Sequence, residues 1–145
     1  MTALTKNLGS NLAAKFGNIQ SYTAGGTIWR GGLVVLNLCD GKAYAATATA
    51  DNGDVTRFLI AGYALEAAVA DGTVRVRQDG KLKRNWQGSD AGKLCGRLAC
   101  VYDDMTVQAA SSGRIVVGRI TETSATQVFV NLEQRPVRIA TGSYD

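Results

Sequence analysis

The sequence predicts a mainly β fold: a single small β-barrel or sandwich domain with an extended N-terminal arm and a C-terminal tail. The chain has 145 residues and is 46% hydrophobic, which suffices for one domain with a buried core. It contains 17 glycines and one proline. Short apolar runs rich in β-branched residues alternate with turn-forming pairs at roughly 8–12-residue intervals, a spacing typical of all-β sandwiches and barrels.

The first 23 residues differ from the rest and are interpreted as an arm. Leu8, Leu12 and Phe16 recur every four residues, with Ile19 three residues later, which favours a short helix. Because so short a helix is marginal in water by itself, we expect the arm to become ordered against another surface. A flexible leader is the alternative.

Residues 24–132 are expected to form the β-rich domain. Residues 33–38 are rich in valine and leucine and end at Asp40-Gly41, a pair typical of hairpins. Residues 73–78 alternate most clearly, so their valines should face the core and their arginines the solvent. Further strands are expected at residues 55–65, 81–86, 94–102, 105–108, 115–121 and 127–132. The tail, 133–145, contains the lone proline, Pro136.

The composition excludes several kinds of catalytic site. The chain has no histidine, which removes Ser-His and Cys-His nucleophiles and every zinc site that uses histidine. The three cysteines, Cys39, Cys95 and Cys100, lack metal-ligand spacing and are expected to be buried thiols. The adjacent carboxylates of Asp103 and Asp104 are best explained by a turn. We therefore expect no enzyme activity, no catalytic residue, no cofactor and no bound metal.

The positive charge is concentrated in the middle of the chain. The net charge is +4, yet residues 75–97 alone contain seven basic residues against two acidic ones. Within this stretch, residues 75–84 are interpreted as a basic hairpin, and the aromatic side chain of Trp86 follows. The candidate contact residues are Arg75, Arg77, Lys81, Lys83, Arg84 and Trp86. Such a hairpin could face an acidic protein surface or nucleic acid, or could simply be solvated.

Five separated segments, taken together, resemble the capsid decoration (cement) proteins of tailed bacteriophages and prophages. They appear in the family's order and cover residues 24–132. The segments are AGGTIWRGGLV (24–34), IAGYA (60–64), DGTVRVR (71–77), SDAGKLC (89–95) leading to VYDDMTV (101–107), and VGRI (117–120) followed by VFVNL (128–132). The long leader and the tail after residue 132 depart from the family pattern.

The resemblance implies a structural virion protein that is made in the host cytoplasm and binds the exterior of an assembled capsid. It implies the major capsid protein as partner, stabilised capsomer junctions and a homotrimer. The expected contact regions are the arm, through Leu8, Leu12, Phe16 and Ile19, and the basic hairpin. No membrane partner is expected, because no signal peptide or long apolar run is present. The alternative function is a small β-barrel nucleic-acid-binding protein.

Overall fold

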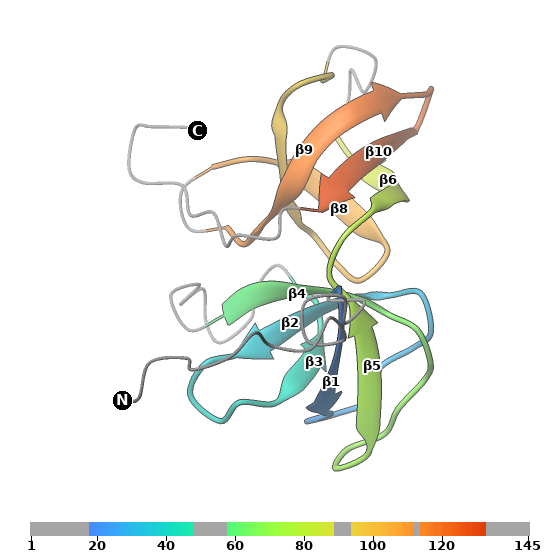
Figure 1. Cartoon of the computed structure of the whole chain (residues 1–145). Coiled ribbons are helices and arrows are strands. Elements are labelled where there is room, and N and C mark those ends of the chain that lie inside the picture. Colours follow the sequence, from blue (N-terminus) through green and yellow to red (C-terminus); the bar gives the residue numbers. More distant parts are fainter. Residues whose placement is uncertain (1–17, 48–57, 89–93, 112–113, 133–145) are drawn as a thin grey trace, which may run out of the picture.

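The computed structural model describes residues 18–47, 58–88, 94–111 and 114–132. Within these residues, ten strands form an open five-stranded sheet and a closed five-stranded barrel (Figure 1). The mainly β fold is confirmed. The sheet contains β1 (Ile19–Thr23), β2 (Leu33–Asn37), β3 (Ala43–Ala45), β4 (Phe58–Ala64) and β5 (Thr73–Arg77). The barrel contains β6 (Lys81–Gln87), β7 (Leu98–Val101), β8 (Thr106–Ala109), β9 (Val116–Thr123) and β10 (Gln127–Leu132).

The open sheet has the strand order β1-β5-β4-β2-β3, and each neighbouring pair is antiparallel. In β5, Val74 and Val76 are fully buried while Arg75 and Arg77 are exposed, so the predicted alternation is confirmed. The predicted turn at Asp40-Gly41 is also present and joins β2 to β3.

The barrel has the order β10-β6-β8-β7-β9 and is closed by the pairing of β9 with β10. Its strands pair antiparallel except for β6 and β8, which run parallel. Alternate residues of β10, namely Val128, Val130 and Leu132, are buried. They fill the interior together with side chains from the other strands, as expected for so small a barrel.

A continuous apolar core joins the barrel to the sheet. It includes Val35 of β2 and Val117 of β9, and the barrel lies directly above the sheet in Figure 1. A second cluster lies among residues such as Val34 and Val76 and is completed by Ile28 from the loop after β1. The sheet therefore has two apolar clusters, and the loop that carries Ile28 belongs to the folded core.

The predicted basic hairpin is wrong. β5 pairs with β1 and β4 in the open sheet, whereas β6 pairs with β10 and β8 in the barrel (Figure 1). The Asp79-Gly80 turn carries the chain from one sheet to the other, and Gly80 has a left-handed φ of 109°. An alternating pattern identifies both strands, but it does not say with which strand each one pairs.

The N-terminal boundary also differs from the expectation. Ile19 was expected to continue a helical pattern within the arm, yet it begins β1, which pairs along its whole length with β5. Tertiary pairing with β5 therefore prevails over the local helical spacing. Leu8, Leu12 and Phe16 lie outside the described residues, as do the tail and the 89–93 segment.

The cysteines are not all buried as expected. Cys100 lies inside β7, where burial raises the pKa of its thiol to about 11. Cys39, in the turn between β2 and β3, and Cys95, in the loop before β7, are both exposed. The prediction is wrong for these two because the turn and the loop place them outside the core.

Candidate partner-binding surface

The most exposed large apolar side chains lie on two loops that touch each other. Ile28 and Ala68 form an antiparallel bridge, with N–H···O distances of 2.8 and 2.9 Å in the two directions. Ile28 points into the core. Since successive side chains of an extended segment point to opposite sides, the flanking residues Trp29 and Val69 project outward and are 65% and 67% exposed. Diagonal positions across such a bridge are about 7–8 Å apart. We call Trp29 and Val69 the exposed apolar pair.

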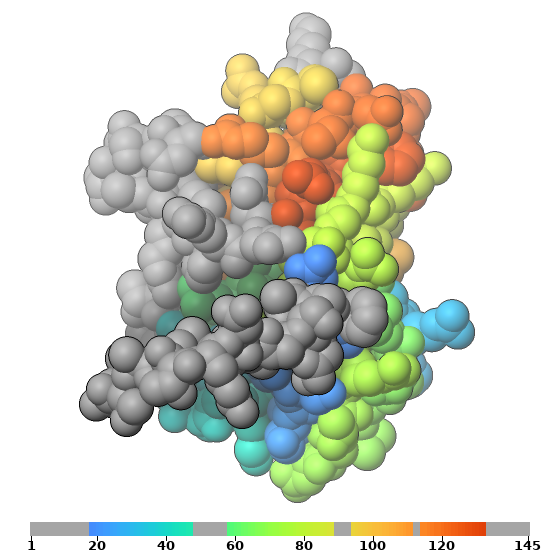
Figure 2. All heavy atoms as spheres, viewed as in Figure 1, coloured from blue at the N-terminus to red at the C-terminus, as the bar shows by residue number. Residues whose placement is uncertain are grey.

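The backbone beside Trp29 is held by hydrogen bonds on several sides. The Gly32 N–H donates to the Trp29 carbonyl at 3.1 Å, and the Gly31 N–H donates to the Ala64 carbonyl at 2.8 Å. The Leu33 N–H donates to the carbonyl of Asp104 at 2.8 Å. Gly31 has a φ of 85°, which a non-glycine residue adopts only with strain. Trp29 is thus an exposed side chain on a fixed turn. The segment between β1 and β2, which carries this turn, projects from the surface in Figure 2 (light blue).

The turn is also tied to the barrel by a buried arginine. Arg84 projects from β6, is only 7% exposed, and donates through its guanidinium to the carbonyls of Gly31 and Lys83. Burial lowers the pKa of Arg84, and the negative charge of Asp104 partly offsets this effect. Its Nε atom has no hydrogen-bond partner among the described residues. Arg84 was predicted to be a contact residue on the surface, and the structure instead places its side chain in the interior.

The two predicted arginines of β5 are exposed but already paired with acids. The Arg75 guanidinium lies 3.2 Å from Glu66, whose carboxylate also accepts from the Arg75 backbone N–H at 3.0 Å. These hydrogen bonds lower the pKa of Glu66. Arg77 lies 2.9 Å from Asp79, which raises the pKa of Arg77. Each arginine therefore presents a largely neutralised ion pair to solvent.

The predicted residues of β6 lie on the barrel. The Lys81 ammonium group is 2.9 Å from Glu122 and 5.5 Å from the centre of the Phe129 ring. Lys83 lies 5.8 Å from the same ring. Trp86, at the end of β6, lines a surface pocket. The structure therefore brings Lys81 and Lys83 together and separates them from the arginines of β5.

Of the predicted arm residues, only Ile19 falls within the described part of the chain. It is 41% exposed, and it lies opposite Arg77 in the pairing of β1 with β5. Antiparallel partners point to the same face. Ile19 therefore presents an apolar side chain beside the cationic side chain of Arg77, on the edge strand of the open sheet.

The sequence reasoning did not identify the exposed apolar pair. The sequence does contain a signal for the exposure of Trp29, because this tryptophan lies between the pairs Gly25-Gly26 and Gly31-Gly32, which are typical of turns. No local signal marked Val69, since its exposure depends on the bridge between Ala68 and Ile28.

Within the described residues, no group of histidine, cysteine or carboxylate side chains is arranged to hold a metal ion. The same residues contain no helix with the length and apolar character needed to cross a membrane. Comparison of the sequence with protein-family models and with curated proteins finds no match.

Proposed function

We propose that the chain is a structural virion protein that binds the exterior of an assembled phage capsid and stabilises the junctions between capsomers. The resemblance of residues 24–132 to capsid decoration proteins supports the capsid as partner. One structural observation supports binding as such: Trp29 is 65% exposed on a turn fixed by hydrogen bonds. This turn lies within the first of the resembling segments.

A fixed exposed tryptophan suits a contact that is repeated many times. Tryptophan is enriched among the residues that dominate interface energies, and truncating such a residue typically costs about 2 kcal/mol or more. Because the turn is already ordered, little additional conformational entropy is lost on binding. A homotrimer would present three such turns, and several modest contacts made together give high avidity.

The direct test is co-sedimentation with empty heads assembled from the major capsid protein of the same genome. We expect the wild-type chain to sediment with the heads, and Trp29→Ala to bind about 30-fold more weakly. Leu38→Ala is the matched control, since Leu38 is 48% exposed in a different turn. Failure of the wild type to sediment would contradict capsid binding. Equal binding by Trp29→Ala would contradict only the role of the exposed apolar pair.

The predicted arm and the exposed basic residues remain part of the proposal, and the structure decides which variants test them. Deletion of residues 1–17 tests the arm and leaves β1, which begins at Ile19, in the sheet. Charge reversal at Arg75 or Arg77 would also break an ion pair within the chain. Lys83→Glu is the cleaner variant, since no carboxylate among the described residues pairs with Lys83. Loss of head binding by the deletion variant would indicate that the arm contacts the capsid. Loss of head binding by Lys83→Glu would indicate the same for Lys83.

Nucleic-acid binding is the second candidate, and one observation favours it. Lys81 and Lys83 flank Phe129 on the barrel surface, and cations beside an aromatic ring are typical of single-strand binding sites. Both ammonium groups lie over the ring, however, and Glu122 neutralises Lys81. These contacts compete with a base for the ring. Filter binding of single strands at low salt tests this candidate, and no retention would eliminate it.

A further inference from the structure

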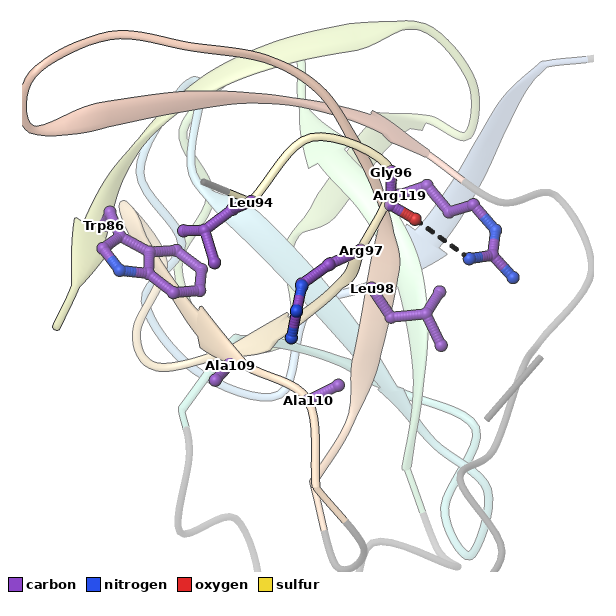
Figure 3. Close-up of a pocket in the computed structure, with 8 residues that line it drawn as sticks. All are labelled: Trp86, Leu94, Gly96, Arg97, Leu98, Ala109, Ala110 and Arg119. Carbon is purple, nitrogen blue, oxygen red and sulfur yellow. Dashed lines mark hydrogen bonds between the residues drawn. The ribbon is translucent and has the colours of Figure 1, made fainter. Parts of the chain in front are cut away.

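A pocket of about 350 Å³ opens on the barrel (Figure 3), and neither residue of the exposed apolar pair lines it. Its apolar lining consists of Trp86, Leu94, Leu98, Ala109 and Ala110. These residues come from the ends of β6 and β8, the beginning of β7 and the loop before β7. Since β6 and β8 run parallel, their ends lie side by side, and both ends contribute to the lining of the pocket.

Two arginines supply the charge of this pocket. Figure 3 shows Arg97 crossing the middle of the group, with its guanidinium directed toward Ala109 and Ala110. Arg119 lies at the edge and donates to the carbonyl of Gly96 at 3.2 Å. Among the residues that the structure describes, no carboxylate lines the pocket. No ion pair connects Arg97 to an acid in the described part of the chain.

We propose that this pocket binds a carboxylate carried by a compact apolar group. The planar guanidinium of Arg97 can donate two parallel hydrogen bonds to a carboxylate, a geometry that lysine cannot reproduce. The indole ring of Trp86 and the side chain of Leu94 provide the surface for the apolar part. The volume lies at the lower end of the range for small-ligand pockets, so the occupant is small.

Such a carboxylate can come from a free organic acid or from a protein segment in which an acidic residue adjoins an aromatic one. Either source presents the same chemistry to Arg97 and Trp86. The inference stands apart from the proposed capsid function, because the pocket and the exposed apolar pair share no residue.

The test uses the indole N–H signals of the isotope-labelled chain in solution. The chain has two tryptophans, so Trp29→Phe leaves a single indole signal, that of Trp86. N-acetylphenylalanine is titrated as the free acid, with N-acetylphenylalaninamide as the uncharged control. We expect the acid to shift the Trp86 signal in a saturable manner, and the amide to bind at least tenfold more weakly.

Arg97→Gln in the same background should weaken binding of the acid at least tenfold. Arg30→Gln is the matched control, because Arg30 is an exposed arginine that does not line the pocket. A blocked tetrapeptide with phenylalanine followed by aspartate distinguishes the sources. Binding of this peptide as tight as that of the free acid indicates a protein segment, and weaker binding indicates an organic acid. The proposal would be overturned if neither N-acetylphenylalanine nor the tetrapeptide shifted the Trp86 signal in a saturable manner. Equal binding of the acid and the amide would also overturn it.

Discussion

Replacement of Gly62 by alanine should destabilise the fold more than replacement of Gly31 or Gly26, because β4 and β5 approach each other closely at Gly62. A Cβ atom at this position would lie 1.9 Å from the carbonyl oxygen of Arg77 and 2.8 Å from its carbonyl carbon. Both are backbone atoms, so no side-chain rotation can relieve the clash. Gly62 also has a φ of 140°, which L side chains rarely adopt.

The expected cost combines two contributions. Holding a non-glycine residue in such a conformation costs about 1–3 kcal/mol. Relieving the clash requires β4 to move from β5, which disturbs the pairing of Tyr63 with Arg77 and of Ala64 with Val76. At about 1 kcal/mol for each lost hydrogen bond, the total is roughly 3–5 kcal/mol. For a chain of this length that corresponds to a decrease in Tm of roughly 6–20 °C.

Thermal and urea unfolding, followed by circular dichroism, measure this effect against two other glycines. Gly31 has a φ of 85° with open space around it, so its alanine variant should lose only about 1–2 kcal/mol. Gly26 has open space and no left-handed φ, so its variant should stay within about 0.5 kcal/mol of the wild type. If Gly62→Ala melted within about 2 °C of the wild type, the close approach of β4 and β5 would be refuted.

Three other predictions concern buried and paired groups. Arg84→Met should lower the free energy of unfolding by about 1–3 kcal/mol in urea denaturation, because the Gly31 carbonyl loses a charged hydrogen-bond donor. Unchanged stability would count against this hydrogen bond. In a thiol titration of the folded chain at pH 8, the two exposed cysteines should react rapidly. Cys100 should react only on unfolding, because its pKa of about 11 and its burial keep it protonated and shielded; three rapidly reacting thiols would contradict its burial. Hydrogen bonds from Arg75 hold the pKa of Glu66 below its ordinary value of 4.5. The stability that this pair contributes is therefore present above pH 4.5 and is lost as the pH falls through the lowered pKa. Glu66→Gln should reduce stability at pH 6, and its stability should converge with that of the wild type as the pH falls through the lowered pKa. A difference independent of pH would refute the pairing.

The alternation of apolar and polar residues made several strands predictable. Val74 and Val76 point inward and Arg75 and Arg77 outward because a strand has a period of two, whatever its partner. The run at 127–132 likewise coincides with β10. The same local reasoning failed for Ile19, whose helical spacing was overridden by pairing with β5.

The candidate surface was much less predictable than the strands. Arg84 alternates with exposed lysines, yet its side chain crosses from the barrel to the turn at Gly31. Its burial depends on a loop 53 residues earlier in the chain. Trp29 is exposed because Ile28 beside it occupies the core, and this requires the bridge to Ala68. Contacts between residues so far apart in sequence leave no local pattern.

By itself, the sequence determined the fold class, the positions of most strands, and the absence of histidine-dependent chemistry. These properties follow from composition and from periodicity, both of which are local. The tertiary structure decided how the strands divide between a sheet and a barrel, and it placed the basic residues of β5 and β6 in different sheets. It also buried Arg84 and exposed Trp29. The physical reason is that strand pairing and burial are set by contacts between distant segments, whereas a periodic pattern records only which face of each strand is apolar.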